Sequence, residues 1–222
     1  MRILLIHTAG SEGSVAIADT EIEPAIVATE QLPGRTSSER LVPAVRRLMA
    51  SRGWSLKDLA AVVVVHGPGS FTGVRVGVSA AKGLSEAGRV PLIAVSRLAL
   101  LASAASKTGE PVHTVLDAGR GEFYYGEYVG RRCLREALLG GEDVRAAASG
   151  GVTIVSEAKV AETLAGLELR VLEEPSAADA LPVALERIAA RDFDDAATLD
   201  ANYLRRTDLE IFAKQISQKA AK

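Results

Sequence analysis

The start of the chain alternates short apolar runs with polar, glycine-containing turns. Apolar runs at 2–7 and 15–19 flank a polar stretch, which is a pattern typical of a β-hairpin. Residues 25–32 add a candidate third strand before the breaker Pro33-Gly34. The pattern therefore predicts that the chain opens as an antiparallel meander.

The next stretch changes to a helical period. Its apolar residues form one stripe made of Leu41, Val42, Val45, Leu48 and Met49. Ser37 or Ser38 can cap the start of this helix, and Gly53 ends it. Because proline is awkward in a helix interior, Pro43 predicts either a start near Leu41 or a bend.

The rest of the chain reads as strands alternating with helices. The run AAVVVV at 60–65 is apolar on both faces, so it predicts a central strand that is covered on both sides. A glycine-rich loop at 67–73 leads into a predicted helix at 72–87. The further predicted strands are 91–95, 112–117, a hairpin-like 121–129, 152–155 and 169–172, and the further helices are 97–105, 157–165 and 177–191.

This order of elements indicates a fold. A hairpin, a third strand and then helix–strand–helix is the order of the ribonuclease H-like unit that actin, the heat-shock chaperone ATPases and the sugar kinases use. We therefore expect an α/β protein of two such lobes, residues 1–105 and 106–198. Residues 199–222 are expected to return to the first lobe.

The composition of the chain limits the classes of function that it can have. The 222 residues carry 26 Lys and Arg against 28 Asp and Glu, so the basic excess of a chain that binds RNA unaided is missing. The one basic stretch reads as a solvated tail and contains Arg205, Arg206, Lys214, Lys219 and Lys222. Cys133 is the only cysteine, and no apolar run is long enough for a signal peptide or a membrane span. We expect a cytoplasmic protein without membrane contact.

Two glycine-containing segments are candidates for chemistry. Backbone N–H groups at a strand-to-helix turn can bind an anion, and the candidate residues are Thr8, Gly10, Ser11, Gly67, Gly69 and Ser70. A tight turn that needs positive φ explains the glycines equally well. No lysine follows the loop, and His7 stands where the superfamily places a metal-coordinating aspartate. The sequence therefore predicts at most a vestigial nucleotide or anion site, with no metal site and no catalytic residue.

One long motif carries a specific resemblance. The word GPGSFTGVRVG at 67–77, with SERLVP at 38–43 upstream, resembles the TsaB (YeaZ) family of bacterial proteins. Further matches lie at 81–84, 91–96, 117–122 and 203–205. The resemblance implies a non-catalytic subunit of the machinery that makes N6-threonylcarbamoyladenosine at position 37 of tRNAs reading codons that begin with A. It implies a TsaD-like catalytic paralogue and a TsaE-like ATPase as partners, with tRNA bound through the complex.

The resemblance also implies a partner surface. In that family the first two helices form a four-helix bundle with the partner or with a second copy of the chain. The residues that we expect there are Leu41, Val45, Leu48, Met49, Gly73, Val74, Gly77 and Ala81. Packing of the small residues onto the chain's own sheet is the alternative. The resemblance leaves open a homodimer and an ATP or ADP molecule at the interface with the partner, and implies no cofactor of the chain's own.

Two departures from the family bear on the alternatives. The family usually has aspartate at the position of His7 and histidine at the position of Ser37. A small-molecule kinase or ATPase of the actin-like class is the second reading, and it would require a carboxylate at position 7. A metallopeptidase is the third, although His7, His66 and His113 lie far apart in the sequence and form no metal-binding motif.

Overall fold

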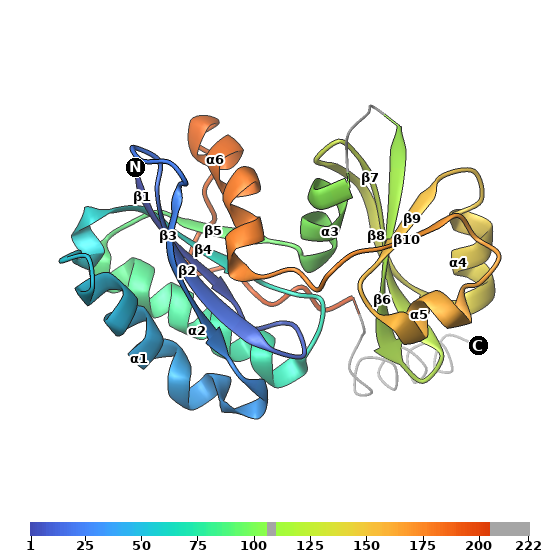
Figure 1. Cartoon of the computed structure of the whole chain (residues 1–222), viewed down its shortest axis with the longest axis horizontal. Helices are drawn as coiled ribbons and strands as arrows, with labels where there is room; N and C mark the ends of the chain where they lie inside the picture. Colours follow the sequence, from blue (N-terminus) through green and yellow to red (C-terminus); the bar gives the residue numbers. More distant parts are fainter. Residues whose placement is uncertain (106–109, 205–222) are drawn as a thin grey trace, which may run out of the picture.

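The computed structural model describes residues 1–105 and 110–204, which form two lobes side by side (Figure 1). Each lobe is built on a five-stranded sheet, with the order β3-β2-β1-β4-β5 in the first and β8-β7-β6-β9-β10 in the second. In both sheets the first three strands of the lobe are antiparallel, and the last two run parallel to the first. The same topology therefore occurs twice, and the predicted α/β fold of two ribonuclease H-like lobes is confirmed.

The first sheet is covered on both faces. Its strands are β1 (Arg2–His7), β2 (Gly13–Asp19), β3 (Ile26–Leu32), β4 (Leu59–Val65) and β5 (Leu92–Val95). Helices α1 (Ser37–Ala50) and α2 (Phe71–Gly88) lie on one face, and α6 (Leu181–Ala189) lies on the other (Figure 1). Residues 61–65 are consequently fully buried, as the apolar run predicts. Short 3₁₀ turns at Gly34–Thr36 and Leu56–Asp58 connect the elements.

Helix α1 starts earlier than predicted. It begins at Ser37 and continues through Pro43, whose side chain is exposed. Proline lacks the N–H that would bond to the carbonyl of Glu39, so the helix forgoes one hydrogen bond. Four of the five residues of its apolar stripe are buried in the core and offset this loss, because packing supplies most of the stability of such a helix; Val42 is exposed instead.

The second sheet lies between α3 on its inner face and α4 with α5 on its outer face (Figure 1). Its strands are β6 (Pro111–Gly119), β7 (Glu122–Val129), β8 (Arg132–Gly140), β9 (Val152–Val155) and β10 (Leu169–Val171). The helices are α3 (Arg97–Ala105), α4 (Gly141–Ala147) and α5 (Ala158–Thr163). The predicted hairpin at 121–129 is instead the single strand β7, and neither β8 nor α4 was predicted.

The division between the lobes differs from the expected one. Leu98, Leu101 and Ala102 of α3 pack in the core of the second lobe. The 3₁₀ turn Ala177–Ala180 and helix α6 pack in the core of the first lobe. The chain therefore crosses between the lobes near Ser96 and again between Leu172 and Ala177, and the predicted limits at 105 and 198 are wrong.

The described C-terminal residues lie against the first lobe. Lys82 Nζ donates to the Leu199 carbonyl at 3.0 Å, and the Asn202 N–H donates to the His66 carbonyl at 2.8 Å. The basic residues of the predicted tail begin at Arg205 and lie outside the described residues.

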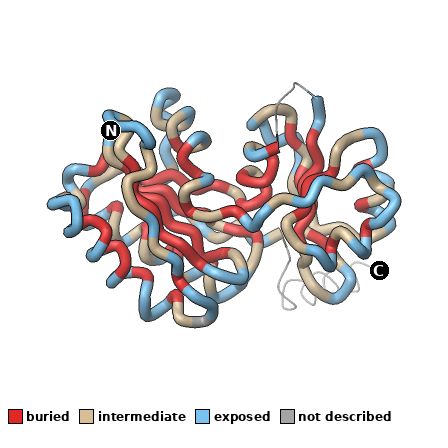
Figure 2. Tube along the Cα trace, in the orientation of Figure 1, coloured by how far each residue is buried: buried red, intermediate tan, exposed pale blue. Residues whose placement is uncertain are grey.

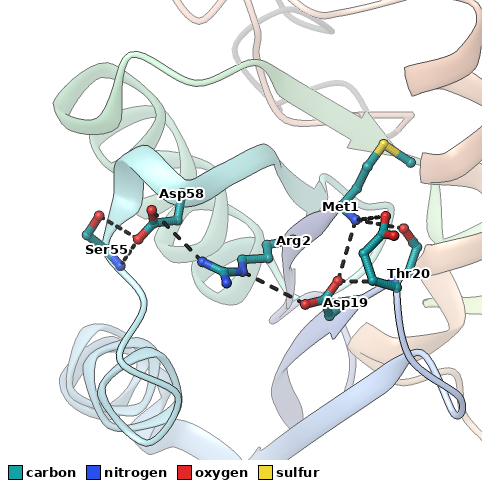
Figure 3. Close-up of polar contacts among 7 residues, drawn as sticks. Met1, Arg2, Asp19, Thr20, Ser55 and Asp58 are labelled. Carbon is teal, nitrogen blue, oxygen red and sulfur yellow. Dashed lines mark hydrogen bonds and ion pairs between the residues drawn. The ribbon is translucent and has the colours of Figure 1, made fainter.

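A polar cluster holds the start of β1 (Figure 3). Arg2 lies 3.8 Å from an Asp19 oxygen and 3.9 Å from an Asp58 oxygen, while Ser55 donates to the other Asp58 oxygen. The Met1 nitrogen donates to Thr20 at 2.8 Å. Exposed ion pairs of this kind contribute about 0–1 kcal/mol each, so the cluster positions the strand end more than it stabilises the fold.

Burial is concentrated in the two sheets and in the helix faces that cover them (Figure 2). Among residues 1–105 and 110–204, no helix combines the length and the apolar character that crossing a membrane would require.

Candidate functional site

The glycine-rich loop docks onto the tip of the first hairpin. Gly69 has φ +154°, and a Cβ at this position would lie 2.0 Å from the Ala9 carbonyl oxygen. The Ser70 N–H donates to that same oxygen at 2.8 Å. Gly67 also has a positive φ, +110°, and its carbonyl accepts from the Arg97 N–H at 2.6 Å. Both glycines are therefore required by backbone geometry and close approach, which was one of the two readings of the loop.

Thr8 connects this loop to helix α2. The Ser70 hydroxyl caps the helix by accepting from the Gly73 N–H at 3.2 Å. Thr8 Oγ1 donates to the Gly73 carbonyl at 2.6 Å. A Cβ on Gly73 would lie 2.0 Å from the Thr8 carbonyl oxygen, and a Cβ on Gly77 would lie 2.3 Å from Thr8 Oγ1. The small residues of α2 thus let the helix pack directly on β1.

This packing corrects the predicted partner surface. The apolar residues expected there are all in the core of the first lobe, namely Leu41, Val45, Leu48, Met49, Val74 and Ala81. Gly73 and Gly77 face Thr8 of the same chain. These eight residues hold α1 and α2 on their own sheet, and all but the half-buried Gly73 are buried there. A partner that binds these helices must contact their outer faces.

The hairpin tip binds a carboxylate of the same chain. The Ser11 N–H donates to Glu174 Oε1 at 3.0 Å, and Ser11 Oγ donates to Oε2 at 2.6 Å. Arg97 Nη2 donates to Oε1 at 2.8 Å, and it lies 3.6 Å from an oxygen of Glu157. Ser11 belongs to the first lobe and Glu157 to the second, while Arg97 and Glu174 lie at the two chain crossings. The cluster therefore joins the lobes.

His7 lies at the end of β1 and is 1% exposed. Neither of its ring nitrogens has a hydrogen-bond partner among the described residues. Burial, assisted by the positive charge of Arg97, lowers the pKa of His7 to about 4. The imidazole is therefore neutral at pH 7, and position 7 offers no carboxylate for a hard cation.

Two cavities adjoin the hairpin tip and contain most of the candidate anion-site residues. One, of about 320 Å³, is lined by Thr8, Gly10, Ser11, Gly34, Ser37, Ser38, Ser70, Thr72, Gly73 and Val76. The other, of about 410 Å³, lies between the lobes and is lined by Ala9, Gly10, Ser11, Gly69, Ser70, Arg97, Asp117, Ala118, Tyr124, Glu157 and Glu174. Gly67 lines neither cavity.

Known proteins match this chain over more than half of its length. The family model described as TsaD, tRNA N6-adenosine threonylcarbamoyltransferase, matches residues 31–148. The tRNA threonylcarbamoyladenosine biosynthesis protein TsaB of Escherichia coli (strain K12) is 39% identical over 130 residues, which are 58% of this chain and 55% of that protein. TsaB of Bacillus subtilis (strain 168) is 34% identical over 146 residues, 65% of this chain and 62% of that protein. The chain belongs to the TsaB (YeaZ) family.

Solved structures of the family agree with the fold. YeaZ from Pseudomonas aeruginosa has a TM-score of 0.76 and 28% identity, and the match covers 91% of this chain and 99% of that chain. The sequence matches are shorter, because the aligned part covers little more than half of the length of the curated TsaB relatives. The TsaB fold is therefore shared by both lobes, although sequence similarity is limited to part of the chain.

The histidines of this TsaB-family chain do not form a metal site. Within the part of the chain that the structure describes, no three His, Cys, Asp or Glu side chains gather in a way that could hold a metal ion. His66 Nδ1 lies 3.4 Å from the Asp200 carbonyl, and His113 Nδ1 lies 2.8 Å from the Tyr125 hydroxyl. The metallopeptidase reading gains no support from these positions.

The outer face of α2 carries an exposed aromatic cluster that was not predicted. The guanidinium of Arg75 lies 3.6 Å from the centroid of the Phe71 ring, and Arg75 Nε donates to the Tyr203 hydroxyl at 2.6 Å. Phe71 is 52% exposed and Tyr203 is 39% exposed. We call Phe71, Arg75 and Tyr203 the outer patch; its one sequence signal is that Phe71 and Arg75 lie four residues apart on α2.

Proposed function

We propose that this chain is a non-catalytic partner subunit in the biosynthesis of tRNA threonylcarbamoyladenosine. The observation that carries the proposal is the similarity to TsaB proteins named for this pathway. In the proposed complex a TsaD-like paralogue transfers the threonylcarbamoyl group to adenosine 37, and a TsaE-like ATPase completes the system. The tRNA is bound through the complex, in agreement with the balanced charge of this chain.

The hairpin tip supports a non-catalytic role. Its N–H and hydroxyl donors at Ser11 are used by Glu174, and position 7 holds a neutral imidazole. An actin-like kinase or ATPase needs these donors for phosphate and a carboxylate for the metal. We therefore propose that the catalytic groups, and an ATP or ADP molecule at the shared interface, depend on the partner.

The outer patch is the surface that we propose for the TsaD-like partner. Exposed aromatic and arginine side chains are enriched in the centres of protein interfaces. Phe71 and Tyr203 are held by Arg75 in a fixed arrangement, so little side-chain entropy would be lost on binding. A homodimer through the same patch would compete with the heterodimer.

The proposal is tested in bacterial cells depleted of their own TsaB. Expression of this chain should restore threonylcarbamoyladenosine in tRNA, measured by mass spectrometry of digested nucleosides. The purified chain alone should hydrolyse ATP no faster than background with Mg²⁺. A failure to restore the modified nucleoside together with steady ATP turnover by the pure chain would favour the kinase reading.

Replacing Phe71 by alanine should weaken binding of the TsaD-like partner. Truncation of a central aromatic anchor typically costs about 2 kcal/mol or more, which corresponds to about 30-fold in Kd. Phe71 lies outside the core and is half exposed, so the melting temperature should change little. Isothermal titration calorimetry with the purified partner measures the effect.

Phe193→Ala is the matched control, because Phe193 is 40% exposed and follows α6 in the chain, next to Asp194, which bridges to Leu92 at the β5 edge of the first sheet. It should leave the partner affinity unchanged. Equal affinity loss in both variants, or none in either, would refute the outer patch as the interface while leaving the proposed pathway intact.

A further inference from the structure

The carboxylate of Glu174 lies in a receptor built from the hairpin tip and Arg97 at the first chain crossing. Three donors reach it: the Ser11 N–H at 3.0 Å, the Ser11 hydroxyl at 2.6 Å and Arg97 Nη2 at 2.8 Å. The carboxylate lies directly against the hairpin backbone, since a Cβ on Gly10 would lie 2.0 Å from Glu174 Oε1. A backbone N–H, a hydroxyl and a guanidinium that converge on one oxyanion form a strong charge-assisted site.

Arg97 is buried, and its main chain is held by a contact that does not involve Glu174. Its side chain is 6% exposed, and its backbone N–H donates to the Gly67 carbonyl at 2.6 Å. Its Nε is buried and has no hydrogen-bond partner among the described residues. The guanidinium therefore retains capacity for an oxyanion with more oxygens than a carboxylate. The guanidinium faces the carboxylates of Glu174 at 2.8 Å and Glu157 at 3.6 Å, so displacing Glu174 would leave a buried positive charge with only the more distant partner, which is costly.

Glu174 can leave this receptor more easily than Arg97 can. It lies in the irregular segment between the lobes, drawn in orange in Figure 1, and its side chain is 32% exposed. Burial alone would raise the pKa of Glu174, but the Ser11 hydrogen bonds and the charge of Arg97 outweigh it and lower the pKa. The carboxylate is therefore ionised at pH 7 and competes as an anion. The adjoining cavity of about 410 Å³ has room for a tetrahedral group.

We infer that Ser11 and Arg97 form an oxyanion site that the chain itself closes with the side chain of Glu174. The site accepts a free tetrahedral oxyanion of the phosphate class when Glu174 is displaced. Phosphate uses the same donors as the carboxylate, and the planar fork of arginine matches both anions. In the closed state Glu174 occupies the site and excludes phosphate. The same contact links the hairpin of the first lobe to the segment that crosses between the lobes.

The experiment compares the parent chain with Glu174→Ala, using inorganic phosphate as the probe. Binding is measured by calorimetry and by the shift of the melting temperature on replacing chloride with phosphate at constant ionic strength. Glu174→Ala should bind phosphate at least tenfold more tightly than the parent and should melt higher in phosphate, since a ligand that binds only the folded state stabilises it. The melting temperature of the parent chain should be the same in phosphate and in chloride.

Glu173→Ala is the matched control, because it removes the same charge from the neighbouring exposed residue. It should behave like the parent chain. Combining Glu174→Ala with Arg97→Lys should weaken the gained affinity, because lysine keeps the charge and loses the fork.

Each outcome of these measurements either supports or overturns the proposed oxyanion site. Equal phosphate binding by the parent, Glu173→Ala and Glu174→Ala would mean that phosphate binds elsewhere, which overturns the inference. No binding by Glu174→Ala overturns it as well. Should Glu174→Ala fail to fold, Glu174→Gln keeps the shape without the charge and takes its place with the same expected results. The inference does not depend on the proposed pathway, which these measurements do not test.

Discussion

Replacing Gly73 by alanine should destabilise the fold, whereas the same replacement at Gly83 of the same helix should stabilise it. A Cβ on Gly73 would lie 2.0 Å from the Thr8 carbonyl oxygen, so α2 must move away from β1. Such overpacking costs about 3 kcal/mol, of which alanine returns about 1 kcal/mol through helix propensity. At Gly83 no atom lies within 4 Å, so the gain of about 1 kcal/mol remains alone.

Urea unfolding followed by circular dichroism measures both variants against the parent chain. The expected difference between them is about 3 kcal/mol in the free energy of unfolding, taken as the sum of the two opposite changes. Gly77→Ala should fall between them, because its Cβ meets the side chain of Thr8 and not the backbone. If Gly73→Ala were as stable as Gly83→Ala, the small face of α2 would not pack on Thr8 and would be free for a partner.

The stripes on α1 and α2 illustrate a limit of periodicity. A repeat of apolar or small residues shows that one helix face is covered, but it carries no information about what covers it. Leu41 and Val45 are covered by the chain's own sheet. The structure instead exposes Phe71 and Arg75 on α2, and their ring and guanidinium contacts identify a surface that the apolar periodicity does not indicate.

The first lobe could be predicted closely because its central strands are buried on both sides. Residues 3–6 and 60–65 are apolar without interruption, and a glycine follows each run within a few residues. Strand β8 gives no such signal. Its sequence RCLREALLG is rich in helix-forming residues, its first half is exposed, and it is held as an edge strand by its ladder with β7.

The sequence alone predicts only the part of the candidate site whose signal is local. The glycines of the hairpin and the loop are visible locally, since positive φ and close approach select this residue. Glu174 is separated from Ser11 by 163 residues and lies in an irregular segment. Glu174 pairs with Arg97 because the two segments that cross between the lobes meet in space. A local repeat of apolar and polar residues gives no information about such a long-range contact.

The stability of the chain should fall steeply between pH 6.5 and pH 4 because of His7. The pKa of His7 is lowered from 6.5 to about 4 in the folded protein, chiefly by burial and then by the charge of Arg97. In this range the unfolded chain binds a proton at His7 and the folded chain does not, so the free energy of unfolding decreases as the pH falls. At about 1.4 kcal/mol per pKa unit, the full loss is about 3.5 kcal/mol.

His7→Leu removes this titration and keeps the position apolar. Its free energy of unfolding, measured by urea denaturation from pH 7 to pH 4.5, should decrease by about 2.5 kcal/mol less than that of the parent chain. His66→Gln is the control; the pKa of His66 is also lowered by burial, but removing it leaves the His7 contribution in place. The lowered pKa values of Asp19 and Glu174 also remove stability as the pH falls through their unfolded values of 3.8 and 4.5, so they overlap only the acid end of this window and are present in both His7→Leu and the parent. Parallel pH curves for His7→Leu and the parent would mean that the folded chain accommodates a charged imidazole at position 7, and the reading of this position as a neutral, buried group would then be wrong.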